Sequence, residues 1–336
     1  MLSFDLSNQA AILSAIHHFI ELSLNFDISD WELMTYLQQL TPAFKAFDQD
    51  EIQYSASIQT FINIIQWIDD GRGECALVDY LDLHSLNQIN EIRRTLVKHR
   101  PFILAEIRQF RDQERDNQKL FLQQVKTIIY DHYQVLIVRV DLGYLKASMP
   151  IITIKDFYTH ISSLIKLMKD KNGCFKHLLG YGLALEQGVT KGYHGHLLLI
   201  YNGSKHAQDW DIGDKVTKKW ESITHHVGYG RHSNTKEIKD NYDRQGILGI
   251  GMIKREHPSQ VHNALKVAQY LVEPEKYGQM LLVKPLGRRS FFKGIYKPHG
   301  RQYQIKFVPP PIDTLYVLTG NQNDTAWLNK LLLSDQ

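Results

Sequence analysis

The sequence has few of the features that identify secreted or membrane proteins. Only two cysteines occur in 336 residues, which is too few for a disulfide framework or a four-cysteine zinc site. No apolar run reaches the length of about 18 residues that a membrane-spanning helix needs. The first residues also lack the basic leader and small-residue cleavage site of a signal peptide. These absences predict a soluble, cytoplasmic protein with no membrane partner.

Two other classes of protein are excluded by composition and by motif. Wholesale disorder is excluded because 43% of the residues are hydrophobic and 11% are aromatic, which is enough to form a core. No glycine-rich phosphate-binding loop occurs, so the chain shows no nucleotide-hydrolysing motor.

The small net charge of +3 conceals two oppositely charged parts. Residues 1–120 contain 10 basic and 18 acidic side chains, a net charge of −8, and the remaining residues contain 29 basic and 18 acidic ones, a net charge of +11. A basic module is a candidate binder of nucleic acid, because its field attracts phosphates. Chance clustering of charge is the alternative explanation.

The first part of the chain has the pattern of a helical bundle. Apolar residues recur at helical spacing, as in Ile12, Ile16 and Ile20. A long helix follows, which we expect Pro101 to interrupt because proline lacks the amide hydrogen of a helical residue. We therefore assign residues 1–124 to an all-α domain of unassigned role.

Strand signals begin after this helical part. A β-branched run at residues 135–140 has the length of a strand, and further strands are expected at residues 178–185, 194–201 and 247–254. With the intervening helices, the order is strand, helix, strand, strand, helix, strand, helix. Two strand–helix–strand units that share one sheet predict an α+β domain of ferredoxin-like form, with an antiparallel sheet, helices on one face and a free second face. The predicted bounds are residues 125–305 for this α+β domain and residues 306–336 for a C-terminal tail.

A candidate metal site lies in the segment LALEQGVTKGYHGHLLLIYNG. His194 and His196 are two apart on a strand and therefore project from one face. If the hairpin turns near Thr190, Glu186 lies opposite His194 with Cβ atoms roughly 5 Å apart. Three such ligands leave positions open for water or a phosphate oxygen and suit a divalent ion, with Mg or Mn expected. The alternative is an accidental His-x-His in a chain with 16 histidines.

A helix that contains a tyrosine follows the histidine strand. Tyr270 and Lys266 share one face of this expected helix, and Pro274 favours a helix end close to the tyrosine. A phenol is a poor nucleophile until a metal-bound phosphate offers an activated centre or a base takes its proton. Most tyrosines on amphipathic helices belong to the core or its rim, so the surrounding pattern decides the interpretation.

The order of these pieces resembles that of the HUH endonucleases, the replication initiators and relaxases that nick single-stranded DNA. More narrowly, VLIVRVDLGY, LEQGVTKGYHGHLLLIYNG and PLGRRSFFKG resemble the YagK/YfjJ-type domain related to inovirus replication initiation proteins. The resemblance covers roughly residues 125–300 and does not extend to the helical part. It implies that His194 and His196 are metal ligands, Glu186 the third ligand and Tyr270 the nucleophile.

Two positions depart from the pattern of this family. Gly195 stands between the histidines, where a bulky hydrophobic residue is usual, but both imidazoles still share one face. The lysine that usually follows the tyrosine by three or four residues is absent, because a glutamate and a proline occupy those positions. We expect Lys276 or Lys266 to replace it. Tyr277 is a second candidate nucleophile, although the proline separates it from the helix.

The resemblance implies a complete nicking reaction. Single-stranded DNA would lie over the free sheet face, and attack by Tyr270 would give a 5′-phosphotyrosine and a 3′-hydroxyl for a polymerase to extend. The expected role is to start rolling-circle replication at the origin of a phage, plasmid or integrated element, with host helicase and polymerase as partners.

Basic residues after the tyrosine helix are candidates for contact with the DNA backbone. They alternate with Phe291, Phe292 and Tyr296, and a mixture of cations and aromatic faces suits single-stranded DNA. The alternative is a solvated basic surface over a packed pair of phenylalanines. The basic residues are Arg288, Arg289, Lys293, Lys297 and Arg301.

Other functions fit parts of the same pattern. A relaxase or transposase would use the same chemistry on different DNA. A DNA-binding regulator would keep the fold without cutting, and the missing lysine after Tyr270 favours that alternative. A barrel-type metal hydrolase also carries His-x-His on its first strand, but the helical N-terminal part and the number of strands disfavour it.

Overall fold

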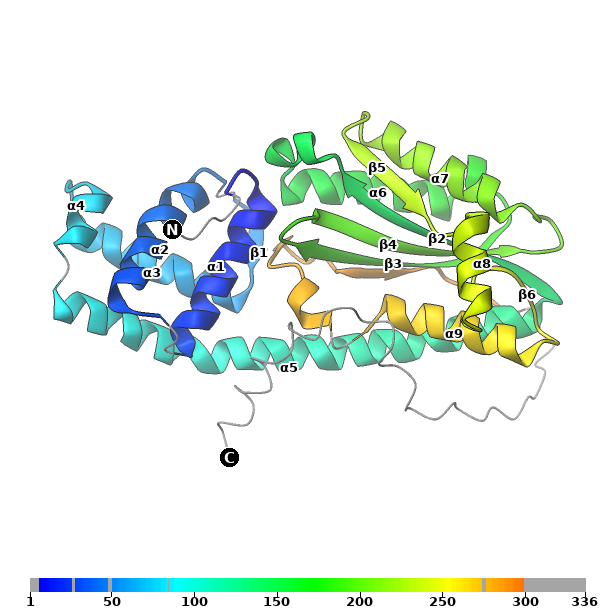
Figure 1. The fold of residues 1–336 in the computed structure, drawn as a ribbon, viewed down its shortest axis with the longest axis horizontal. Helices are drawn as coiled ribbons and strands as arrows, with labels where there is room; N and C mark the ends of the chain where they lie inside the picture. Colours follow the sequence, from blue (N-terminus) through cyan, green and yellow to red (C-terminus); the bar gives the residue numbers. More distant parts are fainter. Residues whose placement is uncertain (1–5, 26–27, 48–49, 84, 274–275, 299–336) are drawn as a thin grey trace.

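The computed structural model describes residues 6–25, 28–47, 50–83, 85–273 and 276–298. The predicted tail and Arg301 lie outside these ranges. The described chain is an α+β structure in which a helical N-terminal region precedes an antiparallel sheet, and this confirms the predicted class (Figure 1). The N-terminal helices are α1 (Gln9–Leu24), α2 (Asp30–Lys45), α3 (Ala56–Arg72), α4 (Leu77–Asp82) and α5 (Leu86–Asp131).

Amphipathic stripes hold the N-terminal helices together, as their spacing predicts. Phe19 of α1 and Phe61 of α3 are fully buried and meet edge to face, with ring centroids 6.1 Å apart. Ser29 and Glu32 form a capping box at the start of α2, which satisfies amide groups that the first helical turn leaves without partners. A short strand, β1 (Ile52–Tyr54), pairs with the distant β7 (Val283–Pro285).

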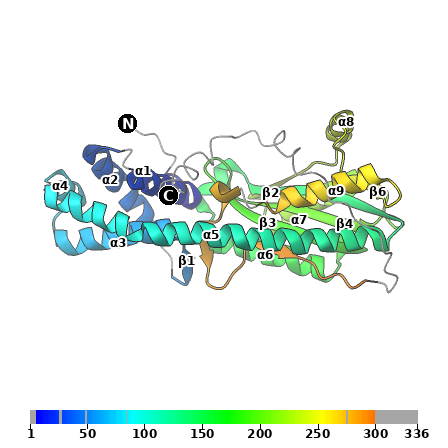
Figure 2. The ribbon, with the colours of Figure 1, turned by 90° about the horizontal axis from the view of Figure 1, so that it is seen from below.

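Helix α5 is continuous for 46 residues. It runs from the N-terminal helices to the far end of the sheet (Figure 2) and crosses the boundary expected at residue 124. The expected interruption at Pro101 was wrong. Pro101 is exposed, so water can reach the carbonyl group that loses its helical partner, and buried residues on both sides, such as Leu96 and Ile103, hold one helix together.

The sheet has the strand order β5-β2-β4-β3-β8, and every neighbouring pair is antiparallel. β6 pairs with the same edge of β2 as β5, but nearer to the start of β2. The strands are β2 (Gln134–Tyr144), β3 (Leu178–Gly188), β4 (Gly192–Asn202), β5 (Gly228–His232), β6 (Gly251–Lys254) and β8 (Phe291–Lys293). The helices among them are α6 (Ile154–Lys169), α7 (Asp209–Ile223), α8 (Lys236–Arg244) and α9 (Pro258–Leu271).

Both faces of this sheet are covered, so the expectation of helices on one face only was wrong. α6 and α7 lie on one face, and α5 and α9 lie on the other (Figure 1). The reason is visible in β4, where Leu197 and Leu199 pack on the first side while Leu198 and Ile200 pack on the second. Strands with such continuous apolar runs are buried on both faces.

The strand after α7 is β5, which the sequence analysis did not predict. The strand expected at residues 247–254 is present only as the short β6. Glycines weaken the strand signal of β5, but close packing against α7 requires them: a Cβ at Gly230 would lie 2.8 Å from the Thr217 side chain, and one at Gly228 would lie 2.6 Å from Thr224.

A membrane-spanning segment was not expected from the sequence. Within the described ranges, no helix combines the length and the apolar character needed to cross a bilayer. α5 has ample length but has charged side chains along most of it.

The packing of α5 on the sheet generates a prediction about stability. Phe121 of α5 is fully buried, stacks edge-on against Phe291 at 5.5 Å and fills the space over Gly182. Phe121→Ala should lower the free energy of unfolding by about 3–5 kcal/mol. The adjacent Leu120 is 50% exposed, so Leu120→Ala should change the free energy of unfolding by less than about 0.5 kcal/mol. Urea denaturation of both variants measures the difference, and equal effects would contradict this packing.

Candidate metal centre

The β3–β4 hairpin brings the three predicted ligands together. Glu186 pairs directly with His194 across the two strands, as the spacing predicts. One ligand atom from each of Glu186, His194 and His196 lies within 4.8 Å of the other two. Glu186 Oε2 is 3.2 Å from His196 Nε2 and 3.5 Å from His194 Nε2, and all three side chains are buried. This group could hold a divalent metal ion.

The outer nitrogen atoms of the two imidazoles already have partners. His196 Nδ1 lies 2.6 Å from Asp141 Oδ1, and His194 Nδ1 lies 3.0 Å from the carbonyl oxygen of Gly192. Each Nδ1–H can donate to its oxygen, which leaves the Nε2 lone pair directed at Glu186. Partners of this kind orient metal-binding histidines and increase their basicity.

The centre contains more acceptors than donors. Glu186 Oε2 is buried and accepts no hydrogen bond from the described residues. It faces two Nε2 atoms that present lone pairs when the outer nitrogens donate. Buried acceptors without a donor are costly, because they have lost water and gained no partner. A cation at this point removes that cost, so the residues present fit a metal ion.

The pKa shifts of Glu186 and His196 also indicate a centre that attracts positive charge. Burial alone would raise the pKa of Glu186, but the close histidines and the charge of Lys276 hold that pKa well below its usual value. Burial alone would lower the pKa of His196, but Asp141 and Glu186 raise it. The centre therefore keeps a carboxylate and attracts positive charge, which either a proton on His196 or a metal ion supplies.

Lys276 and Tyr270 lie beside this group. Lys276 belongs to the 3-10 turn η3 (Lys276–Gln279), and its Nζ donates to Glu186 Oε1 at 3.1 Å. The same Nζ lies 4.3 Å from the ring centroid of Tyr270, in the last turn of α9, and Arg139 Cζ lies 5.5 Å from that centroid. Two cations thus lie close to the tyrosine ring, and one of them also contacts the candidate metal ligand Glu186.

The other two predicted catalytic residues lie elsewhere. Lys266 is on α9, one turn before Tyr270, and among the described residues it is Lys276 that pairs with Glu186. Tyr277 is 3% exposed and packs between the rings of His17 and Phe110, with centroids at 5.9 and 6.0 Å. Burial raises the pKa of Tyr277 well above its usual value. The structure thus brings Lys276 to the centre and places Tyr277 in the core.

The predicted DNA-contacting segment divides into exposed cations and packed aromatic rings. Phe291 is buried against Phe121, and the hydroxyl of Tyr296 donates to Asp131 Oδ2 at 3.0 Å. The aromatic rings therefore serve the core, which was the alternative explanation. Lys293 Nζ donates to Gln124 of α5. The exposed cations of the segment are Arg288, Arg289, Lys293 and Lys297.

Sequence reasoning missed several residues of the centre. The strand was expected to end at residue 140, but β2 continues to Tyr144 and pairs Asp141 with His196. On its other side Asp141 pairs with Arg231 of β5. Tyr229, two residues earlier on β5, is 40% exposed and lies over Gly143. Alternation along β2, which puts Arg139 and Asp141 on the histidine face, is the signal that could have found them.

A groove extends from the centre along the β5 edge of the sheet. Its volume is about 970 Å³, and α7 and α8 form its walls. Arg139 and Asp141 line this groove, and they also contact Tyr270 and His196 respectively. Its lining carries both signs of charge, with Arg231 and Arg244 beside Asp214, Glu221 and Glu237. An extended ligand in this groove would pass beside the candidate metal ligands.

The chain matches no family model, no curated protein and no solved structure in the three comparisons made. Its class is therefore defined by fold and site alone. It is an α+β protein with a buried two-histidine, one-carboxylate centre, and a lysine and a tyrosine lie next to that centre.

The geometry predicts how metal binding responds to mutation. Asp141→Asn should weaken Mn²⁺ binding by about 10- to 100-fold, because an outer partner is lost. Glu186→Gln keeps the shape of a ligand but removes its charge, so it should weaken binding further. Calorimetric titration of metal-free protein measures both affinities. His262→Gln on α9 is the control and should bind as wild type does, whereas wild-type affinity in Glu186→Gln would refute the centre.

Proposed function

We propose that the protein is a metal-dependent endonuclease that nicks single-stranded DNA with Tyr270 as the nucleophile. The observation that carries the proposal is the link from Tyr270 through Lys276 to Glu186. The strand order β5-β2-β4-β3, with α6 and α7 as the two crossovers, supports a ferredoxin-like fold of the HUH type. In this proposal Lys276 takes the place of the lysine that usually follows the tyrosine by three or four residues.

The residues of the centre have separate tasks in this proposal. Glu186, His194 and His196 would hold the divalent ion, and Asp141 fixes the ring of His196. When bound, the ion would polarise a non-bridging oxygen of the scissile phosphate and position that phosphate. Mg²⁺ and Mn²⁺ are the expected ions, and the two imidazole ligands also suit Zn²⁺.

The cleavage step conserves the phosphodiester bond. The phenolic oxygen of Tyr270 forms a bond to phosphorus, and the bond from phosphorus to the 3′ oxygen breaks with its electron pair. The tyrosine proton passes to solvent or to a nearby base, and the 3′ oxygen takes up a proton to become a hydroxyl. Lys276 and Arg139, which lie against the tyrosine ring, would stabilise the negative charge that develops near them.

The groove beside the centre offers a course for the DNA strand. Arg231 and Arg244 line the groove at the β5 edge, and their guanidinium groups would neutralise phosphates. The exposed ring of Tyr229 lies on the same sheet face as the centre and offers a surface on which a base can stack. With α9 and α5 covering the rest of this face, the strand would enter along the groove and not across an open sheet.

The biological reaction that we propose is initiation of rolling-circle replication at the origin of a phage, plasmid or integrated element. Cleavage leaves a 3′-hydroxyl that a host polymerase can extend, and a host helicase would unwind the duplex because this chain shows no motor sequence. A relaxase or a transposase would perform the same chemistry, and the DNA that is cut distinguishes them.

The decisive prediction is a covalent protein–DNA adduct. Labelled single-stranded DNA incubated with wild-type protein and Mn²⁺ or Mg²⁺ should give a band that survives denaturing electrophoresis. Tyr270→Phe should abolish the band, because the attacking oxygen is removed, whereas Tyr277→Phe should retain it. Chelation of the metal should also abolish it. If wild type binds the DNA without forming an adduct, the non-cleaving regulator is the better explanation, and an adduct in Tyr270→Phe would exclude this nucleophile.

A further inference from the structure

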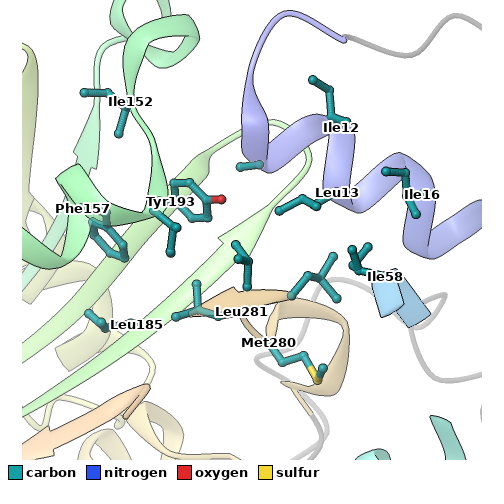
Figure 3. Packing of buried hydrophobic residues seen from close by; sticks show 14 of the residues in the cluster. Ile12, Leu13, Ile16, Ile58, Ile152, Phe157, Leu185, Tyr193, Met280 and Leu281 are labelled. Carbon is teal, nitrogen blue, oxygen red and sulfur yellow. The ribbon is translucent and has the colours of Figure 1, made fainter. Parts of the chain in front are cut away.

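Helix α1 contacts the chain directly behind the metal centre. Gln9 Oε1 accepts a hydrogen bond from the hydroxyl of Tyr193 at 2.9 Å and another from the backbone N–H of Ile154 at 2.8 Å. Tyr193 is 2% exposed and immediately precedes His194. Its hydroxyl points from the hairpin toward α1 (Figure 3). The residue next to one candidate ligand is therefore bound to the first turn of α1.

A second contact involves the residue that follows Glu186. Gln187 Nε2 donates to the carbonyl oxygen of Ala10 at 2.9 Å and approaches Ser14 Oγ at 3.3 Å. Gln187 Oε1 accepts from the backbone N–H of Leu282 at 3.2 Å. Gln187 is 2% exposed, so these bonds replace the water that its amide loses on burial.

A third contact involves the residue that follows Lys276. Tyr277 packs against His17 of α1, and His17 is itself held by Glu21 at 2.7 Å and by Ser57 at 2.8 Å. Ser14, His17 and Glu21 recur at helical spacing and form a polar stripe on α1, and Gln9 lies in its first turn. Each of the three contacted residues is the direct neighbour of a residue in the centre.

The alternation of side chains explains how α1 supports the centre without touching it. Neighbours on a strand project from opposite faces, so Gln187 and Tyr193 point away from the face of Glu186 and His194. The hairpin ends in the pair Gly188 and Gly192, which has no side chains to fix its twist. The contacts to α1 supply that restraint from behind.

We propose that α1 is a positioning element of the metal centre, acting through Tyr193, Gln187 and Tyr277 on Glu186, His194 and Lys276. The helical N-terminal region is then a structural part of the site. This inference rests on the metal centre of the proposed function but not on DNA cleavage. Ligand positions that must agree within fractions of an ångström depend on such supporting bonds.

The test compares two tyrosines on β4. Tyr193→Phe removes the hydroxyl that bonds to Gln9, and Tyr201→Phe removes a buried hydroxyl on the same strand that donates to Cys174 O at 3.1 Å, away from α1. Both variants lose one buried hydrogen bond, so their melting temperatures should fall by similar amounts. Only Tyr193→Phe should weaken Mn²⁺ binding, by about 3- to 10-fold, which is a smaller effect than that expected when a ligand loses its outer hydrogen-bond partner. Only this variant should also change the paramagnetic resonance line shape of bound Mn²⁺.

Each outcome decides the proposal. Equal Mn²⁺ affinity in the two variants, whether lowered or unchanged, would overturn it, and so would a wild type that binds no Mn²⁺. If wild type binds Mn²⁺ and the two variants differ as expected, but no DNA adduct forms, the positioning role of α1 is supported and the proposed nicking activity is refuted.

Discussion

The structure depends on one electrostatic constraint: a buried carboxylate oxygen and two imidazole nitrogens point at one another. Glu186 Oε2 lies within 3.5 Å of Nε2 of both histidines, and no group in the described part of the chain donates a hydrogen bond to it. Such an arrangement is stable only with positive charge at its middle or edge. Lys276 supplies charge at the edge, on Oε1, and leaves Oε2 and the two nitrogens for an ion.

The architecture around this point keeps these groups in place. α9 ends beside the centre, which puts Tyr270 against Lys276, and α5 covers the same sheet face and links it to the N-terminal helices. α1 closes the other side of the hairpin. One hydrophobic core therefore contains residues of both the acidic N-terminal helices and the basic sheet region. Acidic and basic parts share a core and, we propose, a site.

The elements with strict periodicity were predictable from the sequence, and those decided by tertiary contacts were not. Two-residue alternation, together with a hairpin turn near Thr190, was enough to place Glu186 opposite His194. The position of Lys276 was not predictable, because it lies after the end of α9, where no periodic pattern fixes the chain. Asp141 was missed because Gly143, which makes room for Tyr229, resembles a turn residue. The cover over the second sheet face was predictable from residues 196–201 (HLLLIY), because such an unbroken apolar run is typical of a strand that is buried on both faces.

The most direct test of the central claim is a crystal structure of the protein soaked in Mn²⁺, with anomalous differences recorded for the metal. The account predicts one strong peak between Glu186 Oε2 and the Nε2 atoms of His194 and His196, at about 2.0–2.3 Å from each. It also predicts that His196 Nδ1 keeps its contact with Asp141. The absence of a peak at that point, at metal concentrations that saturate ordinary sites, would contradict the account.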